Sequence, residues 1–399
     1  MPHYKYLIIG AGMTGDAALH GIREVDLEGS IAVIGAEADP PYDRPPLSKA
    51  LWKGQPLDSV WRSAEGLGAE FHLGRKIVAL DAAGKRATDD RGTVHTFEKL
   101  LLATGGTPRR LPFGDGRINY FRTLADYRNL RASSEGGRRF AVIGGGFIGS
   151  EIAAALAMNG REVTILLPHE TIGSRVFPRE LGLFLNAFYA QKGVRVLIGH
   201  TAIGSAPQGE RLRLEAKAVG SANIETMVVD GVVAGIGVEP NSELARTSGL
   251  EVDGGIHVDE VLRTSHPDIF AAGDVAAFRN PALGKRIRVE HEDNANPMGL
   301  AAGRAMAGAG EPYRHQPFFY SDLFELGYEA VGELDARLEV VADWKDPNRE
   351  GVLYYLENGR VRGVLLWNVW GQVEAARRLI AEPGPFRPAD LEGRLPEEH

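Results

Sequence analysis

Residues 4–15 read Tyr4-Lys-Tyr-Leu-Ile-Ile-Gly10-Ala-Gly12-Met-Thr-Gly15, and this stretch predicts a buried strand that turns tightly into a helix. Side chains at the three glycines would keep backbone amides away from a pyrophosphate and the helix away from the strand. A second apolar run follows at 31–34, and Glu37 stands just past its end, where a carboxylate can accept hydrogen bonds from ribose hydroxyls. We therefore expect a strand-helix-strand unit that holds a dinucleotide at its helix N-terminus.

The same plan recurs in the middle of the chain. Gly144-Gly-Gly146-Phe-Ile-Gly149 follows an apolar run at 140–143 and opens a predicted helix over 147–158, with a further strand predicted over 163–167. One such glycine pattern is weak evidence, because ordinary glycine-rich turns match it too. Two copies, each in full strand-helix-strand context, predict two bound dinucleotides.

The composition is that of a large globular protein. With 399 residues, 44% of them hydrophobic, the chain can form two or three domains with proper cores. No apolar run is long enough for a membrane span, and the first strand begins almost at Met1, so we expect neither a membrane span nor a signal or transit peptide. A cytoplasmic location is the default expectation. The net charge of −8 argues against nucleic-acid binding.

The chain contains no cysteine. This excludes disulfides and cysteine-ligated zinc or iron-sulfur centres within the chain. It also excludes a redox-active thiol, because serine and threonine cannot carry out that chemistry. Any iron-sulfur centre must therefore belong to a partner.

Other segments mark the edges of these units. The strand at 100–102 ends in small residues that include Thr104 and Gly105, and a short strand near 270 ends at Gly273 and Asp274, a candidate ligand for a polyol chain. Residues 231–240 are predicted to form a buried strand that runs into a turn. Residues 131–138 contain Ser-Ser-Glu-Gly-Gly and are interpreted as a solvated connection into the second unit.

The most specific motif is Pro41-Tyr-Asp-Arg44-Pro-Pro-Leu-Ser-Lys49, followed by Ala-Leu-Trp52. Together with the two glycine turns, it resembles the two-dinucleotide-binding-domain flavoproteins, and within them the branch of apoptosis-inducing factor and oxygenase-coupled ferredoxin reductases. The tail, with Gly327-Tyr-Glu-Ala-Val-Gly332, is most similar to the apoptosis-inducing-factor type. Further matching segments are Ala-Thr-Gly105, Gly-Ser-Glu151, Phe-Ala-Ala-Gly-Asp274, Arg288-Val-Glu-His291, Phe319-Tyr-Ser-Asp322 and Gly363-Val-Leu-Leu-Trp-Asn368.

The resemblance implies an α/β fold with two Rossmann-like, three-layer nucleotide-binding domains and a C-terminal α+β domain. An FAD domain would comprise residues 1–120 and 241–310, with the NAD(P)H domain inserted at 121–240 and the C-terminal domain at 313–399. In such proteins the nicotinamide stacks on the flavin and passes a hydride to flavin N5.

Lys49 and Glu151 are the catalytic residues that the resemblance implies. Taken alone, Lys49 follows Ser48, a plausible helix cap, and would lie on an exposed first turn, while Glu151 would favour its helix dipole. The family instead pairs the two, so that the ammonium stabilises charge on the reduced flavin and the carboxylate orients the nicotinamide amide. Buried pairs of this kind are better explained by function than by stability.

The remaining cofactor residues also follow from the resemblance. Phe147 is expected to move as a shutter over the flavin, and Tyr320 stands where relatives carry tryptophan. On the FAD side we expect Gly10, Gly12, Gly15, Glu37, Arg44, Pro45, Lys49, Thr104, Gly105, Asp274, Glu290, His291 and Tyr320. On the NAD side we expect Gly144, Gly146, Phe147, Gly149, Glu151, Glu170 and Gly237.

The preference between NADH and NADPH depends on the residues after Leu167. An acidic residue at this strand end favours the free ribose of NADH, whereas arginine favours the phosphate of NADPH. Here His169 takes the position of the acid, Glu170 follows it, and Arg175 lies farther along. We expect NADH, with NADPH as the alternative. We expect no metal at residues 290–293, since consecutive side chains rarely converge on one ion.

Two functions remain open. The first is an FAD-dependent NAD(P)H oxidoreductase that passes electrons to an external acceptor, such as a 2Fe-2S ferredoxin or a quinone, without a redox-active disulfide. The second is a redox-responsive interaction protein resembling apoptosis-inducing factor, with slow turnover and NADH-linked dimerisation. Either form would be a monomer or a homodimer.

Overall fold

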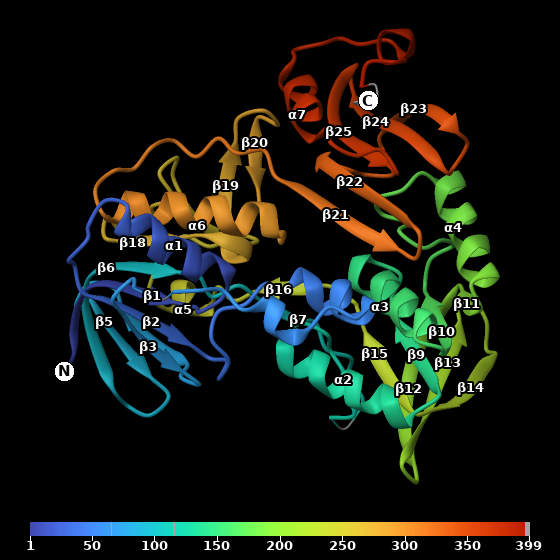
Figure 1. Cartoon of the computed structure of the whole chain (residues 1–399), viewed down its shortest axis with the longest axis horizontal. Helices are drawn as coiled ribbons and strands as arrows, with labels where there is room; N and C mark the ends of the chain where they lie inside the picture. The colour runs from blue at the N-terminus through green and yellow to red at the C-terminus, as the bar shows by residue number, and fades with distance from the viewer. Residues whose placement is uncertain (65, 115, 396–399) are drawn as a thin grey trace. The chain divides into compact units, whose positions relative to one another are not determined.

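The computed structural model describes residues 1–64, 66–114 and 116–395, which form two compact units (Figure 1). The first unit comprises Met1–Arg44, Leu57–Thr107 and Glu239–Phe318. The second comprises Pro45–Pro56, Pro108–Val238 and Phe319–His399. The division into three domains, with boundaries near 120, 240 and 313, stays a prediction, and its last four residues lie outside the described chain.

A mixed sheet forms the centre of the first unit, with the order β3-β2-β1-β6-β5-β4. The strands β3, β2, β1 and β6 are parallel, and β18 pairs in parallel with the C-terminal part of β6 while β5 pairs antiparallel with its N-terminal part. Buried apolar side chains occupy both faces of β1, as expected for a strand inside a parallel sheet. The strands are β1 His3–Ile9, β2 Ile31–Gly35, β3 Ala69–Leu73, β4 Ile77–Asp81, β5 Arg86–Asp89, β6 Val94–Leu102 and β18 Ile269–Ala271.

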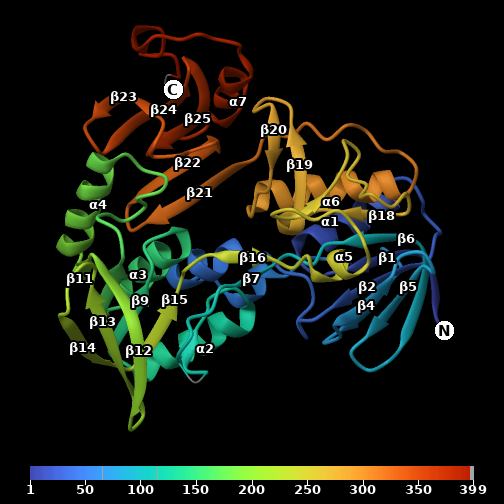
Figure 2. The ribbon, with the colours of Figure 1, turned by 180° about the vertical axis from the view of Figure 1, so that it is seen from behind.

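Two helices from distant parts of the sequence, α1 (Met13–Arg23) and α6 (Glu292–Met306), pack side by side in this unit (Figures 1 and 2). Glycines allow this close contact. A Cβ atom at Gly21 would lie 2.1 Å from the carbonyl oxygen of Leu300, and one at Gly303 would lie 2.1 Å from that of Ala18. The segment 239–318 therefore completes the unit that residues 1–44 and 57–107 begin.

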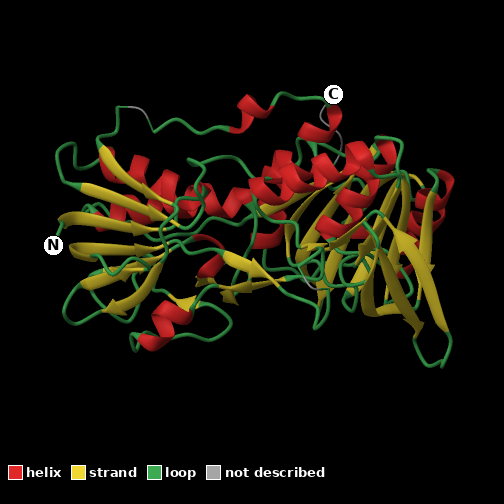
Figure 3. Cartoon of the chain, turned by 90° about the horizontal axis from the view of Figure 1, so that it is seen from below, coloured by secondary structure: helices red, strands yellow, loops and turns green. Residues whose placement is uncertain are grey.

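The second unit contains a parallel sheet with the order β11-β10-β9-β15-β8 and an antiparallel sheet with the order β12-β13-β14. Figure 3 shows the strands and helices of the chain by type. The helices of this part are α2 Leu124–Gly136, α3 Phe147–Met158 and α4 Arg179–Gln191. The strands are β8 Ile118–Asn119, β9 Arg139–Ile143, β10 Glu162–Leu167, β11 Val194–Ile198, β12 His200–Gln208, β13 Arg211–Ala218, β14 Ile224–Val229 and β15 Gly231–Ala234.

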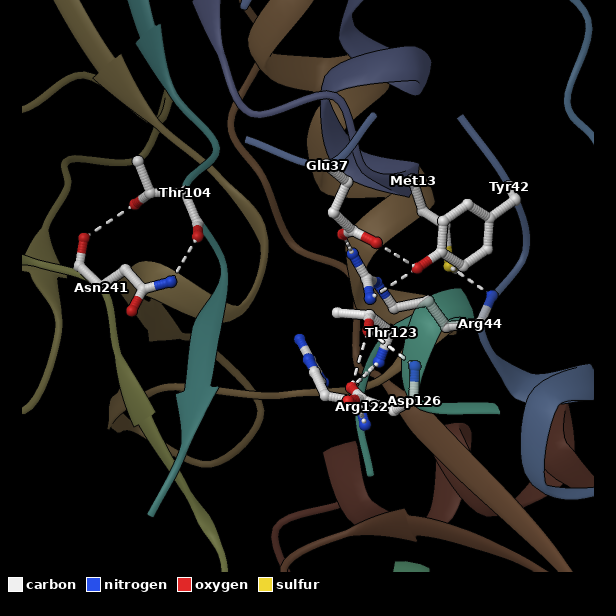
Figure 4. Close-up of polar contacts among 9 residues, drawn as sticks. All are labelled: Met13, Glu37, Tyr42, Arg44, Thr104, Arg122, Thr123, Asp126 and Asn241. Carbon is white, nitrogen blue, oxygen red and sulfur yellow. Dashed lines mark hydrogen bonds and ion pairs between the residues drawn. The ribbon is translucent and has the colours of Figure 1, made fainter. Parts of the chain in front are cut away.

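Helix α2 corrects one expectation, because residues 131–136 are helical and not a solvated connection. Thr123 and Asp126 form a reciprocal capping box, in which the Asp126 amide donates to Thr123 Oγ1 at 3.2 Å and the Thr123 amide donates to Asp126 Oδ2 at 2.7 Å (Figure 4). Leu124, Tyr127 and Leu130 are buried along one face. The cap and this buried face outweigh the weak helix propensity of the serines and glycine at the C-terminal end.

The C-terminal segment of the second unit is a five-stranded sheet with the order β21-β22-β25-β24-β23, against which α7 (Val373–Ala381) packs. Phe177 holds it to the rest of the unit, since its ring lies 5.4 Å from that of Tyr328 and 5.6 Å from that of Trp367. The Tyr355 hydroxyl also donates to the Val176 carbonyl at 2.8 Å. The strands are β21 Phe318–Leu323, β22 Leu326–Gly332, β23 Glu339–Asp346, β24 Glu350–Glu357 and β25 Arg360–Trp367.

Short elements complete the fold. There are two further small sheets, one that pairs β16 with β7 and one with the order β17-β19-β20. Within the described residues, no helix is long and apolar enough to cross a bilayer. The short elements are β7 Gly106–Pro108, β16 Val238–Pro240, β17 Ile256–His257, β19 Ala276–Asn280, β20 Lys285–Ile287, α5 Glu243–Thr247, and the 3-10 helices η1 Pro45–Ser48, η2 Ala50–Lys53, η3 Leu57–Val60, η4 Gly273–Val275 and η5 Pro388–Asp390.

Candidate active site

The first glycine turn leaves space for an anion at the N-terminus of α1. A Cβ at Gly10 would lie 2.1 Å from the Ala103 oxygen, and one at Gly15 would lie 1.9 Å from the Gly10 oxygen, so the protein itself excludes side chains there. A Cβ at Gly12 would meet only Arg44 Nη2, at 3.8 Å, among the described atoms outside the adjoining chain. Gly12 is the N-cap of α1, and no described side chain caps the helix. The free amides and open space fit a pyrophosphate.

The second glycine turn repeats this arrangement at α3. A Cβ at Gly144 would lie 2.4 Å from the Gly235 oxygen, and one at Gly149 would lie 1.9 Å from the Gly144 oxygen. A Cβ at Gly146 would meet no atom of the described chain within 4 Å outside its neighbours. Gly146 is the N-cap of α3, again without a capping side chain in the described structure. Each unit therefore carries one turn that fits a dinucleotide.

Glu37 lies in a cluster with Tyr42 and Arg44 (Figure 4). The Tyr42 hydroxyl donates to Glu37 Oε2 at 2.6 Å, and Arg44 Nη2 donates to Glu37 Oε1 at 2.5 Å. Arg44 Nη1 also donates to the Tyr42 hydroxyl at 3.1 Å. Arg44 and Tyr42 thus hold the Glu37 carboxylate, which is expected to bind the ribose. Tyr42 was missed by the sequence analysis, although it lies within the quoted motif.

Thr104 uses its polar groups within the first unit. Its hydroxyl donates to the Asn241 carbonyl at 2.8 Å, and the Asn241 amide donates back to the Thr104 carbonyl at 2.8 Å (Figure 4). The Asn241 backbone amide donates to Gly105, whose positive φ of 64° suits glycine. Thr104 and Gly105 therefore join two distant segments, whatever they contribute to a cofactor.

Asp274 lies near the carboxyl end of β18, and Glu290 lies near the start of α6. Arg288 Nη1 donates to the Asp274 carbonyl at 2.9 Å and to Glu290 Oε1 at 2.6 Å. His291 is the N-cap residue of α6. Asp293 pairs with His315 at 2.6 Å, and no three acidic or histidine side chains of the described residues come close enough to hold a metal ion. Arg288 was not predicted as a site residue.

Lys49 and Glu151 lie together in the second unit, with Lys49 Nζ 2.8 Å from Glu151 Oε1. The Lys49 side chain is 12% exposed and that of Glu151 is 3% exposed, so Lys49 is not a lysine on an exposed turn. Ser48 does not cap a helix. Its hydroxyl donates to Glu151 Oε2 at 2.5 Å, and the hydroxyl of Ser321 donates to Glu151 Oε1 at 2.6 Å. Neither serine contact was predicted.

Aromatic side chains adjoin this pair. Lys49 Nζ lies 5.2 Å from the ring centre of Tyr320, which is 37% exposed. This distance is within the range of a cation–π interaction. Phe147, the first residue of α3, packs edge-on against Phe319 with 5.0 Å between ring centres. Pro45 begins η1, four residues before Lys49 in the same segment.

Glu170 follows β10 at the expected position, but it is already paired. Arg179 at the start of α4 binds both carboxylate oxygens of Glu170, with a distance of 2.8 Å from Nε to Oε2. The arginine beside it holds the pKa of Glu170 below its usual value. Gly237 has a φ of 101° and lies against the Arg109 side chain, whose nearest atom would be 3.7 Å from a Cβ at Gly237.

These features describe a protein with one glycine turn that fits a dinucleotide on each unit and a buried lysine–glutamate pair in the second. The chain matches the family model described as pyridine nucleotide-disulphide oxidoreductase over residues 4–299. It also matches the model of the C-terminal part of apoptosis-inducing factor, mitochondrion-associated, over 302–350 and 343–382. The chain belongs to the pyridine nucleotide-disulphide oxidoreductase family.

Individual relatives agree with this assignment. The chain is 33% identical to apoptosis-inducing factor 1, mitochondrial, of Dictyostelium discoideum, over 94% of this chain and 78% of the relative. It is 35% identical to the ferredoxin–NAD(+) reductase component of the anthranilate 1,2-dioxygenase system of Burkholderia cepacia, over 96% and 97%. The solved covalent complex of putidaredoxin reductase with putidaredoxin has a TM-score of 0.89 and 27% identity, over 98% of this chain and 95% of that chain.

The family and fold confirm several expectations. The α/β fold with two Rossmann-like regions and a C-terminal sheet is confirmed. The protein is an oxidoreductase that uses FAD and a nicotinamide nucleotide, as predicted. The family name mentions a disulphide, but this chain has no cysteine to form one.

Proposed function

We propose that the protein transfers electrons from NADH, through FAD, to an external one-electron carrier such as a 2Fe-2S ferredoxin. The observation that carries this proposal is the absence of cysteine from a member of a family named for disulphide chemistry. The likeness to a ferredoxin–NAD(+) reductase over 97% of that relative supports it. When bound, FAD supplies the ability to accept a hydride pair and to release electrons singly.

The chain's own residues have distinct roles in this proposal. The amides beyond Gly12 and Gly146 bind the two pyrophosphates, and Glu37, held by Arg44 and Tyr42, binds the adenosine ribose of FAD. Lys49 stabilises negative charge on the flavin side, and Glu151 accepts a hydrogen bond from the nicotinamide amide. Pro45, Thr104, Gly105, Asp274, Glu290, His291 and Tyr320 remain proposals for the FAD side, and Phe147, Glu170 and Gly237 for the NAD side.

The wider organisation is proposed on the same basis. We infer an FAD domain from 1–120 and 241–310, an NAD(P)H domain from 121–240 and a C-terminal domain from 313. The separate match of the tail to a C-terminal model supports the last boundary. A cytoplasmic location is proposed, supported by the likeness to bacterial ferredoxin–NAD(+) reductases.

The test combines rapid reduction with an acceptor assay. The purified holoprotein is mixed with NADH in a stopped-flow instrument, and bleaching of the flavin absorbance is followed. A 2Fe-2S ferredoxin is then added to the reduced protein. Fast bleaching and rapid reoxidation by the ferredoxin support the proposal, whereas bleaching followed by reoxidation no faster than with oxygen alone contradicts the ferredoxin acceptor.

A second candidate function is favoured by the tail. The C-terminal match and the Dictyostelium relative support a redox-responsive interaction protein like apoptosis-inducing factor, with slow turnover and NADH-linked dimerisation. Size-exclusion chromatography of the oxidised and the NADH-reduced protein distinguishes the two. A long-lived charge-transfer absorbance together with a doubled mass after reduction supports the second function, and an unchanged mass supports the first.

The Glu170–Arg179 pair predicts how nucleotide preference can be changed. In Glu170→Gln, loss of the negative charge frees Arg179 to bind a 2′-phosphate, so we expect the ratio of kcat/KM for NADPH to that for NADH to rise about tenfold, or about 1.4 kcal/mol. Arg179→Ala should lower the same ratio. Both side chains are more than half exposed, so neither variant should unfold. A ratio that stays constant in both variants would remove this pair from nucleotide selection.

A further inference from the structure

The carboxylate of Glu151 is buried, and hydrogen-bond donors occupy most of its acceptor positions. A carboxylate offers about four acceptor positions. On Oε1, Lys49 Nζ and the Ser321 hydroxyl occupy two, and on Oε2 the Ser48 hydroxyl occupies one. These three donors offset the cost of burying the charge. Among the described residues, one acceptor position remains on Oε2.

Tyr328 lies on β22, the strand next to β21, which carries Ser321. The buried phenol of Tyr328 interacts with the Ser321 side chain, whose hydroxyl donates to Glu151. Burial raises the pKa of Tyr328 well above its usual value, and the negative charge of Glu151 acts in the same direction. The Tyr328 phenol therefore stays protonated and adds no charge beside Glu151.

The hairpin that carries Ser321 is fixed at its tip. Phe324, between β21 and β22, has a φ of 63°, an uncommon conformation for an aromatic residue. Its ring packs edge-on against Phe188 at 5.8 Å and Tyr189 at 5.1 Å. Beside it, Glu325 pairs with Lys192 at 2.7 Å. Packing on α4 thus stabilises the strained residue and sets the position of β21.

We propose that Ser321 and Ser48 are positioning residues that lock the Glu151 carboxylate in one orientation, leaving Oε2 as the acceptor for the carboxamide of the nicotinamide. The proposal rests on the role of Glu151 in the proposed function. It adds that the C-terminal sheet, through Ser321, takes part in recognising the nicotinamide. Ser321 is 1% exposed and Ser48 is 5% exposed, so bulk water does not compete with either contact.

The test compares two nucleotides that differ at the carboxamide. NAD+ can donate an amide hydrogen to Oε2, whereas 3-acetylpyridine adenine dinucleotide carries a methyl ketone and cannot. Binding of each to the oxidised holoprotein is measured by titration calorimetry, which involves no turnover. We expect the unmodified protein to prefer NAD+ about tenfold, the effect of one buried hydrogen bond.

In Ser321→Ala we expect this preference to fall to about twofold or less, because the carboxylate can then rotate and Oε2 is no longer held towards the carboxamide. Ser48→Ala should lower it less, since Oε1 keeps both donors. Ser134→Ala is the matched control: Ser134 is also buried in the second unit, but its hydroxyl donates to Arg131 O within its own helix, so the preference should be unchanged.

A preference that persists in Ser321→Ala would overturn the proposal. If Ser321→Ala does not fold, Ser48→Ala decides, and an unchanged preference there would have the same meaning. An unmodified protein that binds both nucleotides equally would overturn the contact with Oε2. Flavin reduction by NADH and reoxidation by ferredoxin, measured on the same preparation, test the proposed function separately.

Discussion

Replacing Gly12 with valine is expected to yield a folded but colourless protein. The backbone of Gly12, with φ −86° and ψ −171°, accepts any residue, and nothing in the described chain blocks a side chain there. The valine would instead fill the space in front of the α1 amides. Losing two charge-assisted hydrogen bonds to the pyrophosphate should weaken FAD binding at least about 100-fold. The measurement is the ratio of the flavin absorbance, at about 450 nm, to the protein absorbance, at about 280 nm, after purification.

Gly146→Val is the matched control, because it makes the same change at the second turn. This variant should keep its FAD and colour but lose reduction by NADH at micromolar concentrations. Circular dichroism should show that both variants are folded. If Gly12→Val retains a full complement of FAD, or if Gly146→Val loses FAD in place of NADH binding, the assignment of the two turns is wrong.

The parts of the fold that depend on neighbouring residues could be predicted from the sequence. Each glycine turn, with its strand and helix, lies within about 30 residues, as expected for a strand-helix-strand unit, and the predicted helix over 147–158 matches α3. Helix α2 was not predicted, because the serines and glycines that follow were interpreted as a connection and the capping box formed by Thr123 and Asp126 was not recognised. The packing of α1 on α6 could not be predicted in detail, because it depends on backbone contacts such as that between Gly303 and Ala18.

The candidate site shows the same limit. The pairing of Lys49 with Glu151 was expected only from family resemblance, since the residues alone allowed a solvated lysine and a dipole-stabilised glutamate. Ser321 lies 170 positions from Glu151 in the sequence, and a serine in a strand carries no local signal of its partner. Tyr42 lay within the most specific motif, but its contact with Glu37 needs the turn of the chain that brings the phenol back to the carboxylate.

The Lys49–Glu151 pair predicts opposite electrostatic effects for its two members. In Lys49→Met, Glu151 keeps the hydroxyls of Ser48 and Ser321, so the protein should fold with FAD bound, but an uncompensated negative charge remains. We expect flavin reduction by NADH to slow about 100-fold, as for loss of one preorganised electrostatic group, and the flavin reduction potential to fall. In Glu151→Gln the lysine is left uncompensated. The potential should then rise, while reduction slows about tenfold because the neutral amide oxygen of glutamine is a weaker acceptor for the nicotinamide amide than a carboxylate.

Lys53→Met is the control that separates a specific role of Lys49 from the loss of any nearby lysine. Lys53 lies four positions along the same segment and also forms an ion pair, with Asp322 at 2.6 Å, but its side chain is 42% exposed. Solvent screens such a pair, so its removal should change neither rate nor potential. In the double variant Lys49→Met/Glu151→Gln the two charge effects cancel, and the potential should return towards that of the unmodified protein. Shifts of the same sign in both single variants would contradict an electrostatic role, because removing a cation and removing an anion must act on developing negative charge in opposite directions.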